Sequence, residues 1–362
     1  MDILLDIREL SEWGIPYSGI FVISGPCSAE SRKQLIETAS AIAKYPVSAL
    51  RAGIWKPRTR PGSFEGVGAE GLAWLKEAGD RVGLPVMVEV AKPAHVEKCL
   101  GQGIDMLWIG ARTTTNPFAV QEIADALRGV DIPVLVKNPI SPDLSLWIGA
   151  IERVNRAGIT RIAAIHRGFC SFNEKVYRNK PEWWIPIELR RKIPDLPMIC
   201  DPSHICGKVV LLSGIIRKAM DLLFDGLMIE CHINPPAALS DAEQQVTPDE
   251  LGALLSQLNV KKVSTDDPRY IRGITHLRST IDELDEQIMQ LLMQRMMIST
   301  EIGRLKKQSN ISILQPERWQ KMLQERLEAA KGKGLDGRFV LRLYQYIHEE
   351  SIRRQELADL NE

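Results

Sequence analysis

The stretch GLMIECHINPPAALSDAEQQ, residues 226–245, begins as an apolar β-rich run and ends in a polar loop. Seven similar runs precede it: FVISGP from 21, SALRAG from 48, VMVEV from 86, MLWIGA from 106, VLVKNP from 134, IAAIHRG from 162 and MICDPSH from 198. Amphipathic helical segments such as SRKQLIETASAIAKY fill most of the intervals. Apolar strands that alternate with helices are typical of a parallel sheet covered on its faces. Eight such units predict a closed α/β barrel, the (β/α)8 TIM barrel, rather than an open doubly wound sheet.

Functional side chains stand at the end of every predicted strand. They are Cys27, Arg51, Glu89, Arg112, Lys137, His166, Arg167, Asp201, His204 and Glu230. In a barrel the carboxyl ends of the strands form one face, and active sites lie there. A solvated loop charge is the simpler interpretation of any one of these residues, but it does not account for all eight strand ends. The sequence therefore predicts an active site on this face.

Metal ligands of mixed type are present among these residues and just beyond them: Cys27, His204, Glu230 and Asp241. One sulfur, one nitrogen and two oxygens suit a borderline divalent ion, Mn2+, Fe2+, Co2+ or Zn2+, rather than calcium or magnesium. Cys27 alone would more simply be a small buried residue, and Asp241 could cap a helix at SDAEQQ. A zinc knuckle of Cys200, Cys206 and Cys231 is a further alternative, although CDPSHIC lacks the usual close spacing of a ligand pair.

Glu230, Cys231 and His232 are consecutive, and strand side chains point alternately to opposite faces of a sheet. If Glu230 faces the mouth of the barrel, Cys231 faces the surrounding helices as a packing residue. His232 is then expected behind the metal ligands, where it supports them.

Cations are equally dense in this part of the chain: Arg51, Lys56, Arg58, Arg112, Lys137 and Arg167. Arginine binds phosphate and carboxylate groups through two hydrogen bonds at once, and lysine adds a point charge. Six cations exceed what one phosphate requires, which predicts two phosphorylated substrates, or one that also carries a carboxylate.

The segment GVGAEG at 66–71 fits a dinucleotide-binding pattern. That pattern needs a strand directly before it, and here the loop RTRPGSFE precedes it, so we do not interpret it as a dinucleotide site.

The overall composition excludes other classes of partner. Lys plus Arg and Asp plus Glu number 46 each, so nothing indicates a nucleic-acid or membrane surface. No apolar run approaches the roughly 18 residues of a membrane span, and the N-terminus MDILLDIRELSEWG lacks the basic start of a secretory signal. The scattered cysteines are typical of reduced thiols, so we expect a cytoplasmic protein.

The motifs GPCSAES, LRAGIWKPRTRPGSFEG, IGART, VKNP, HRGF, DPSHICG and GLMIECHINPPAALSDAEQQ identify a family. Over residues 15–258 the chain resembles the type I 3-deoxy-D-arabino-heptulosonate 7-phosphate (DAHP) synthases. The resemblance implies condensation of phosphoenolpyruvate with erythrose 4-phosphate at the entry to the shikimate pathway. Sister enzymes that make 3-deoxy-octulosonate 8-phosphate share the barrel and most of the metal site, and KPRT at 56–59 favours the DAHP branch.

The same resemblance implies roles for individual residues. The metal would be bound by Cys27, His204, Glu230 and Asp241. The substrates would be bound by Arg51, Lys56, Arg58, Thr59, Arg112, Lys137, Arg167 and His204. Among these, Arg112, Lys137 and Arg167 would hold the phosphate of phosphoenolpyruvate. Arg51 and Lys56 would lie near its carboxylate, and Arg58 and Thr59 would meet the aldose phosphate. Lys56 is the candidate that gives a proton to the new hydroxyl.

The β-rich runs stop after residue 260. The following segment, KKVSTDDPRYIRG, is polar and aperiodic, so we expect a barrel domain at 1–260, a linker at 261–269 and a helical domain at 270–362. From 277 to 305 apolar residues recur at intervals that alternate between four and three. This pattern predicts a helix of about thirty residues with one heptad seam. Arg295 occupies a seam position and should meet an anion there.

LRSTIDELDEQIMQLLMQRMMISTEIGRLKK and LRLYQYIHEESIRRQ resemble the all-helical chorismate mutases over residues 275–356. The resemblance implies that chorismate or prephenate is bound by Arg278, Arg295, Lys306, Gln315, Arg318, Ser351 and Gln355, of which Arg295, Lys306 and Gln355 are catalytic. Arg278 precedes Arg295 by about 25 Å along one helix, so it would come from the partner helix of a homodimer or larger assembly. Trp319 stands where the family commonly has a glutamate, and Gln315 where an acid is frequent.

Three hypotheses follow from the two resemblances. The leading one is a bifunctional enzyme, a DAHP synthase joined to a chorismate mutase. In the second, the helical domain is a catalytically weak sensor that binds chorismate or prephenate. In the third, two independent enzymes are joined only for co-expression. The barrel motifs begin at Ser24, so we expect any feedback control to run through the helical domain.

Overall fold

A computed structural model of the chain describes residues 4–56, 62–172, 174–261 and 264–357. The chain divides into two compact units, Met1–Val263 and Ser264–Glu362. In the described residues the strands all belong to the first unit, and the second unit is built from helices. No helix in the described part of the chain is long and apolar enough to cross a membrane.

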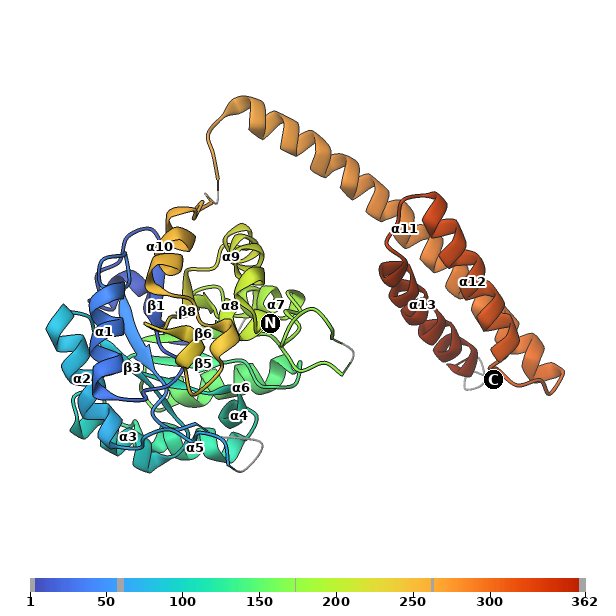
Figure 1. Ribbon diagram of the computed structural model, residues 1–362. Helices are drawn as coiled ribbons and strands as arrows, with labels where there is room; N and C mark the ends of the chain where they lie inside the picture. The colour runs from blue at the N-terminus through green and yellow to red at the C-terminus, as the bar shows by residue number, and fades with distance from the viewer. Residues whose placement is uncertain (1–3, 57–61, 173, 262–263, 358–362) are drawn as a thin grey trace. The chain divides into compact units, whose positions relative to one another are not determined.

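Parallel strands form a closed barrel in the first unit and follow one another in sequence order (Figure 1). They are β1 (Phe21–Gly25), β2 (Ala49–Ala52), β3 (Val86–Val90), β4 (Met106–Ile109), β5 (Val134–Lys137), β6 (Ile162–His166), β7 (Met198–Cys200) and β8 (Gly226–Glu230). The first and last strands pair from Phe21↔Gly226 to Gly25↔Glu230, which closes the sheet. The predicted TIM barrel is therefore confirmed, with one strand in each predicted run.

The strands are apolar throughout because each face of the sheet packs against a different core. Ile23, Trp108 and Met228 belong to the cluster inside the barrel. Val22 and Val88, at alternate positions of their strands, belong to the larger cluster between the barrel and the surrounding helices. A parallel sheet buried on both faces therefore explains the absence of polar alternation in the sequence.

Helices alternate with the strands in the first unit, and the longer ones cover the outside of the barrel (Figure 1). They are α1 (Arg32–Ile42), α2 (Glu70–Val82), α3 (Pro93–Gly101), α4 (Ala111–Thr114), α5 (Pro117–Ala126), α6 (Leu144–Arg156), α7 (Trp184–Lys192), α8 (Pro202–Cys206), α9 (Leu212–Asp221) and α10 (Pro248–Ser256). Side chains satisfy free backbone N–H groups at several starts: Ser31 caps α1, Asp143 caps α6, and Thr247 forms a capping box with Glu250 in α10.

The second unit consists of α11 (Pro268–Gln308), α12 (Pro316–Gly332) and α13 (Gly337–Leu357). Helix α11 is 41 residues long, so the prediction of about thirty residues was too short. It begins inside the segment read as aperiodic, because Asp267 accepts a hydrogen bond from the Arg269 N–H and Pro268 suits the first helical position. The predicted seam of α11 is largely exposed in the single chain; Ile288 is 52% and Leu291 64% accessible.

Candidate active sites

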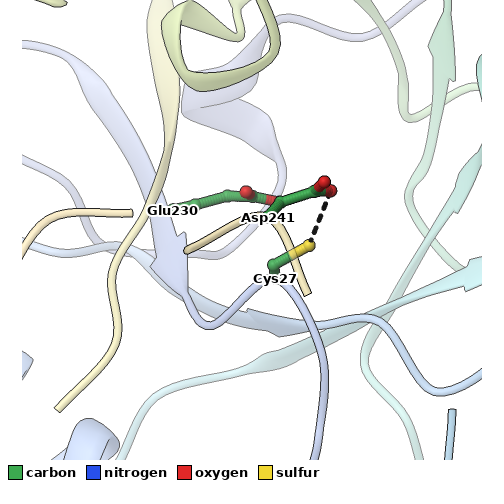
Figure 2. Close-up of side chains that lie close together, drawn as sticks. All are labelled: Cys27, Glu230 and Asp241. Carbon is green, nitrogen blue, oxygen red and sulfur yellow. Dashed lines mark hydrogen bonds between the residues drawn. The ribbon is translucent and has the colours of Figure 1, made fainter. Parts of the chain in front are cut away.

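Three of the predicted metal ligands meet at the mouth of the barrel. Cys27 follows β1, Glu230 ends β8, and Asp241 lies in the loop beyond β8 (Figure 2). One ligand atom from each residue lies within 4.8 Å of those of the other two. Cys27 Sγ is 3.3 Å from Asp241 Oδ2. Because β1 and β8 are neighbours in the closed barrel, residues about two hundred positions apart become adjacent.

His204, the fourth predicted ligand, lies at the edge of this group. It belongs to α8, directly after β7, and its Nε2 is 3.7 Å from Glu230 Oε1. Its other ring nitrogen, Nδ1, lies 2.8 Å from Asp201 Oδ2. A carboxylate on the second nitrogen is the usual device that fixes the orientation of a metal-binding histidine. Sulfur, imidazole and two carboxylates in this arrangement fit a borderline divalent ion.

Two of the alternative interpretations of these residues, a helix cap and a zinc knuckle, are not supported. Asp241 precedes a short 3-10 helix, but its side chain makes no capping hydrogen bond there. Its φ of 50° lies in the left-handed region, which is uncommon for a residue with a side chain and often marks a functional position. Within the described residues, Cys200, Cys206 and Cys231 form no group close enough to share a metal ion.

Cys231 follows the predicted alternation, whereas His232 makes no recorded contact with the predicted metal ligands. Cys231 is fully buried in the core between barrel and helices, as predicted for a packing residue. His232 Nε2 lies 3.5 Å from Glu30 Oε2, and His232 is not a member of the three-residue group, so its predicted support of the ligands stays a prediction. His166 differs from the expectation of a strand-end functional group. It packs among aromatic rings, 5.2 Å from Trp183 and 5.7 Å from Phe169, because its side chain takes the outward direction from β6.

Buried cations stabilise the acidic ligands. Arg51, only 1% exposed, donates to Glu230 Oε1 at 2.8 Å and to the Cys27 carbonyl at 3.0 Å. Lys56 Nζ lies 2.9 Å from both the Cys27 carbonyl oxygen and Cys27 Sγ. Burial alone would raise the pKa of Glu230, but the charges of His204 and Arg51 outweigh burial and lower it.

The pKa values of the other two ligands move in opposite directions. Burial alone would raise the pKa of Asp241, but the charges of Arg178, His204 and Lys56 lower it well below its usual range. Burial, followed by the charge of Glu230, raises the pKa of the Cys27 thiol to about 12. At neutral pH the sulfur is therefore a thiol unless a cation stabilises the thiolate, as a bound metal does.

A cavity of about 340 Å³ is lined in part by His204, one of the predicted metal ligands. Its lining includes Glu89, Arg112, Lys137, Ile140, Arg167, Cys170, Arg178, Asn179 and His204. The three cations predicted to hold one phosphate, Arg112, Lys137 and Arg167, thus share one cavity. Lys137 Nζ is 2.8 Å from Asp201 Oδ2, which offsets part of the cost of burying its charge. Arg58 and Thr59, predicted at the aldose phosphate, lie outside the described residues.

Several residues that form hydrogen bonds or ion pairs with the predicted metal ligands were not predicted from the sequence. Arg178 lies 3.0 Å from Asp241 Oδ1 and donates to Gln244 Oε1 at 2.6 Å. Gln244 Nε2 in turn donates to Glu230 Oε2 at 2.6 Å, and Gln245 Oε1 accepts from the Cys27 N–H at 2.9 Å. The glutamines follow Asp241 by three and four residues in SDAEQQ, so their closeness to a predicted ligand could have indicated them. Arg178 lies in the loop after β6, and no local pattern indicates it.

In the second unit, the structure gives hydrogen bonds for four of the predicted ligand-site residues. Arg295 of α11 donates a short hydrogen bond to Ser351 Oγ of α13. Gln355 Nε2 donates to the Ser351 carbonyl at 3.2 Å, and Lys306 Nζ donates to the Ile313 carbonyl at 2.5 Å. The helices approach closely because Gly303 has no side chain; an added Cβ would lie 2.8 Å from the Gln355 Cα.

The other predicted residues of this site are exposed in the single chain. Gln315 is the N-cap residue of α12, and Arg318 lies in the first turn of that helix. Arg278 lies on the exposed first half of α11. The predicted contribution of Arg278 from a partner helix stays a prediction.

Two family models match the chain. Residues 18–266 match the DAHP synthetase I family, and residues 277–356 match chorismate mutase type II. Among similar proteins, the phospho-2-dehydro-3-deoxyheptonate aldolase of Thermotoga maritima is 35% identical over 225 residues, 62% of this chain and 64% of the relative. The chain thus spans less than two thirds of that relative. The 2-dehydro-3-deoxyphosphooctonate aldolase of Nitratidesulfovibrio vulgaris is 27% identical over 66% of this chain and 90% of the relative.

Solved structures show the same relationship. The crystal structure of the DAHP synthase from Thermotoga maritima has 31% sequence identity and a TM-score of 0.62, and the match covers 70% of this chain and 72% of that chain. A truncated form of the synthase from the same organism has 28% identity and a TM-score of 0.59, with 71% and 90% covered. Both structural matches therefore cover a large part of this chain.

Proposed function

Because the chain belongs to the DAHP synthetase I family and carries a chorismate mutase type II domain after it, we propose that it is a bifunctional shikimate-pathway enzyme. One activity condenses phosphoenolpyruvate with erythrose 4-phosphate to DAHP and inorganic phosphate. The other, an isomerase, rearranges chorismate to prephenate. We assign the synthase, a transferase, to residues 1–260 and the mutase to residues 270–362, joined by a linker at 261–269. The free cysteines of the described residues support a cytoplasmic location.

The observation that carries the synthase proposal is a group of metal ligands beside a cation-lined cavity on one barrel face. Cys27, His204, Glu230 and Asp241 would hold the divalent ion. When bound, such an ion supplies Lewis acidity, which makes the aldehyde carbon of the aldose electrophilic toward phosphoenolpyruvate. The nearby cavity supplies the cations that a phosphorylated, carboxylated substrate needs.

The residues of the chain bind and orient the two substrates. Arg112, Lys137 and Arg167 hold the phosphate of phosphoenolpyruvate, and Asp201 keeps the Lys137 ammonium in place. Arg51 is almost fully buried and pairs with Glu230, so in our proposal it supports the ligand, and Lys56 meets the substrate carboxylate. Restricting both substrates within one cavity converts a bimolecular step into an effectively unimolecular one.

Lys56 is the proton donor to the new hydroxyl in this proposal. Burial alone would lower the pKa of its ammonium, but the charges of Glu230 and of the Cys27 thiolate, the form that a bound metal stabilises, outweigh burial and raise it. The ammonium is therefore charged at neutral pH and carries a proton at the edge of the metal site. The enol carbon of phosphoenolpyruvate bonds to the aldehyde carbon, water adds to the resulting cationic centre, and inorganic phosphate leaves.

Metal removal tests this proposal, and the choice of aldose separates the two sister activities. After chelation we expect loss of phosphate release from phosphoenolpyruvate with either aldose, and recovery when Mn2+, Fe2+, Co2+ or Zn2+ is added back. We expect erythrose 4-phosphate to be the preferred aldose over arabinose 5-phosphate, the substrate of the octulosonate branch. Full activity in the chelated enzyme would contradict metal dependence, and preference for arabinose 5-phosphate would assign the octulosonate branch.

The mutase proposal depends on Arg295, Lys306 and Gln355. The arginine binds a carboxylate of chorismate, and Lys306 and Gln355 stabilise charge at the ether oxygen whose bond breaks. Holding the reactive conformer and stabilising that charge are sufficient for a pericyclic rearrangement. Trp319, which stands where the family commonly has a glutamate, favours the second candidate function, a sensor that binds chorismate or prephenate without efficient turnover. The decrease in chorismate absorbance separates the two, because a sensor shows no decrease above background.

Feedback control is the remaining part of the proposal. We propose that prephenate bound to the helical domain lowers the rate of the synthase. The test compares the full chain with a chain truncated after residue 263, each with and without prephenate. Inhibition of the full chain only supports feedback through the helical domain. Equal rates in all four measurements support two independent activities.

A further inference from the structure

Two stacked rings lie at the predicted ligand site of the helical unit. The Trp319 indole of α12 and the His348 imidazole of α13 have centroids 4.0 Å apart and planes only 9° from parallel. His348 precedes Ser351 by three residues and Gln355 by seven, so all three side chains share one face of α13. The ring pair therefore borders the same face that presents the two predicted ligand-site residues.

Unsatisfied polar atoms occur on this face. In the described part of the chain, His348 Nε2 and Gln355 Oε1 are buried side-chain atoms without a hydrogen-bond partner. Burial, and then the charges of Arg295 and Lys306, lower the pKa of the His348 imidazole, so these two cations act on the same ring. Buried polar groups in folded proteins nearly always have partners, and exceptions are common where a ligand binds. Two such atoms beside two cations fit an anionic ligand that also carries a hydroxyl or ether oxygen.

We propose that His348 is a catalytic residue of the helical domain, which contacts an oxygen of the bound cyclic dicarboxylate through Nε2, and that Trp319 is a positioning residue which holds the imidazole by stacking. The inference rests on the proposed function of the helical domain. The family commonly has a glutamate at position 319, where this chain has a tryptophan, so α12 provides no carboxylate there. In our proposal His348 of α13, which stacks on Trp319, provides a polar contact in its place. The ring is neutral near pH 7, since its pKa is lowered, and a neutral imidazole can donate one hydrogen bond.

A purely structural role is the competing explanation of the stack. Two flat rings between α12 and α13 would pack the helices together whether or not a nitrogen faces the ligand. His348→Phe separates the explanations, because phenylalanine keeps an aromatic ring for stacking and removes the hydrogen bond. His348→Gln keeps an N–H donor and removes the ring. Tyr346→Phe is the matched control, since Tyr346 lies on the same helix and is 71% exposed.

The experiment measures chorismate turnover by the full chain and its variants, with melting curves to show that each is folded. If the proposal is right, His348→Phe lowers kcat/KM by about tenfold or more, the loss expected for one hydrogen bond to a charged or polar substrate. His348→Gln recovers part of that loss, and Tyr346→Phe stays at the wild-type value. Wild-type turnover in His348→Phe overturns the proposal, as does a loss in His348→Phe that His348→Gln does not reduce at all.

The role of Trp319 is tested by a double-mutant cycle. Trp319→Ala should lower kcat/KM about as much as His348→Phe, and the double variant should lose little more, because both changes remove one contact. Independent, additive losses would show that the tryptophan does not act through the histidine.

The design also separates this inference from the proposed mutase activity. If the wild-type chain does not turn over chorismate, the mutase proposal fails, and chorismate affinity measured by calorimetry becomes the readout. Weaker binding by His348→Phe than by wild type then supports the contact, and equal binding overturns it. A wild-type chain that neither converts nor binds chorismate overturns both proposals.

Discussion

At the scale of single residues, Cys27 and Cys231 are the same amino acid, but their positions in the fold predict different roles. Both thiols are fully buried, and burial raises the pKa of each. Only Cys27 has carboxylates of the metal group around it, with Asp241 Oδ2 at 3.3 Å. Cys231, one residue beyond Glu230, points to the opposite side of the strand and packs among apolar side chains.

The two cysteines form a matched pair for mutation. We expect Cys27→Ala to reduce bound metal and to lower synthase activity by more than about 100-fold, because a direct ligand matters at least as much as the groups that support ligands. Cys231→Ala should keep full metal content and activity, and lose only about 1 kcal/mol of stability from the small cavity. Metal analysis per chain and phosphate release test the prediction. Equal metal content in the two variants would contradict it.

His166 makes a residue-scale prediction about pH. Burial lowers the pKa of its imidazole to about 3, against about 6.5 in an unfolded chain. Between these values the unfolded chain binds a proton that the folded chain does not, so the unfolding free energy falls as the pH decreases below about 6.5. One such group contributes up to about 1.4 kcal/mol per pH unit. His166→Phe should reduce that dependence between pH 6.5 and 5, measured by urea unfolding. An unchanged slope would show that this imidazole is protonated in the folded protein.

At the scale of elements, the contact between α11 and α13 depends on Gly303. An added Cβ would lie 2.8 Å from the Gln355 Cα and 3.0 Å from its carbonyl oxygen, distances that force the helices apart. Gly303→Ala should therefore destabilise the helical unit by about 1–3 kcal/mol and weaken chorismate turnover or binding, while synthase activity is kept. Gly273→Ala on the same helix is the control. Nothing lies within 4 Å of its added Cβ, so it should be neutral or stabilise by about 0.5–1 kcal/mol.

The elements also show what the sequence could predict. The eight strands were predictable because apolar runs and strand-end polar residues repeat along the chain. Glu230 and Cys231 could be separated by alternation alone. The start of α11 was missed because Asp267 and Pro268, which begin the helix, were read as linker residues. Arg178 was missed because a loop residue reaches Asp241 only after the fold is complete. The stack of Trp319 on His348 joins two helices, so no single segment indicates it.

At the scale of the whole molecule, the exposed seam of α11 predicts association. Leu284, Ile288 and Leu291 are 51–64% exposed and recur at heptad spacing on one helix. A continuous apolar seam of this kind is usually buried against another helix. Arg278 lies on the same helix and is also exposed, so its side chain is accessible to a partner chain.

We therefore expect the full chain to sediment as a dimer or larger assembly and Ile288→Glu with Leu291→Glu to dissociate it. Mutase activity should fall with dissociation if Arg278 comes from a partner. Leu335→Glu is the control, because Leu335 is 49% exposed but lies between α12 and α13. Analytical ultracentrifugation combined with chorismate turnover tests this prediction. A wild-type monomer with full mutase activity would contradict it.

The pairing of β1 with β8 has a consequence for biosynthesis. Cys27 leaves the ribosome long before its partner Asp241, which lies 214 residues later. At about 5–20 residues per second, that interval lasts roughly ten to forty seconds. For nearly all of it the thiol lacks both of its carboxylate neighbours, Glu230 and Asp241, and β8 has not yet closed the sheet. The predicted metal site therefore cannot be complete before β8 and the loop after it have been made, so we expect metal to bind only after most of the barrel has been synthesised.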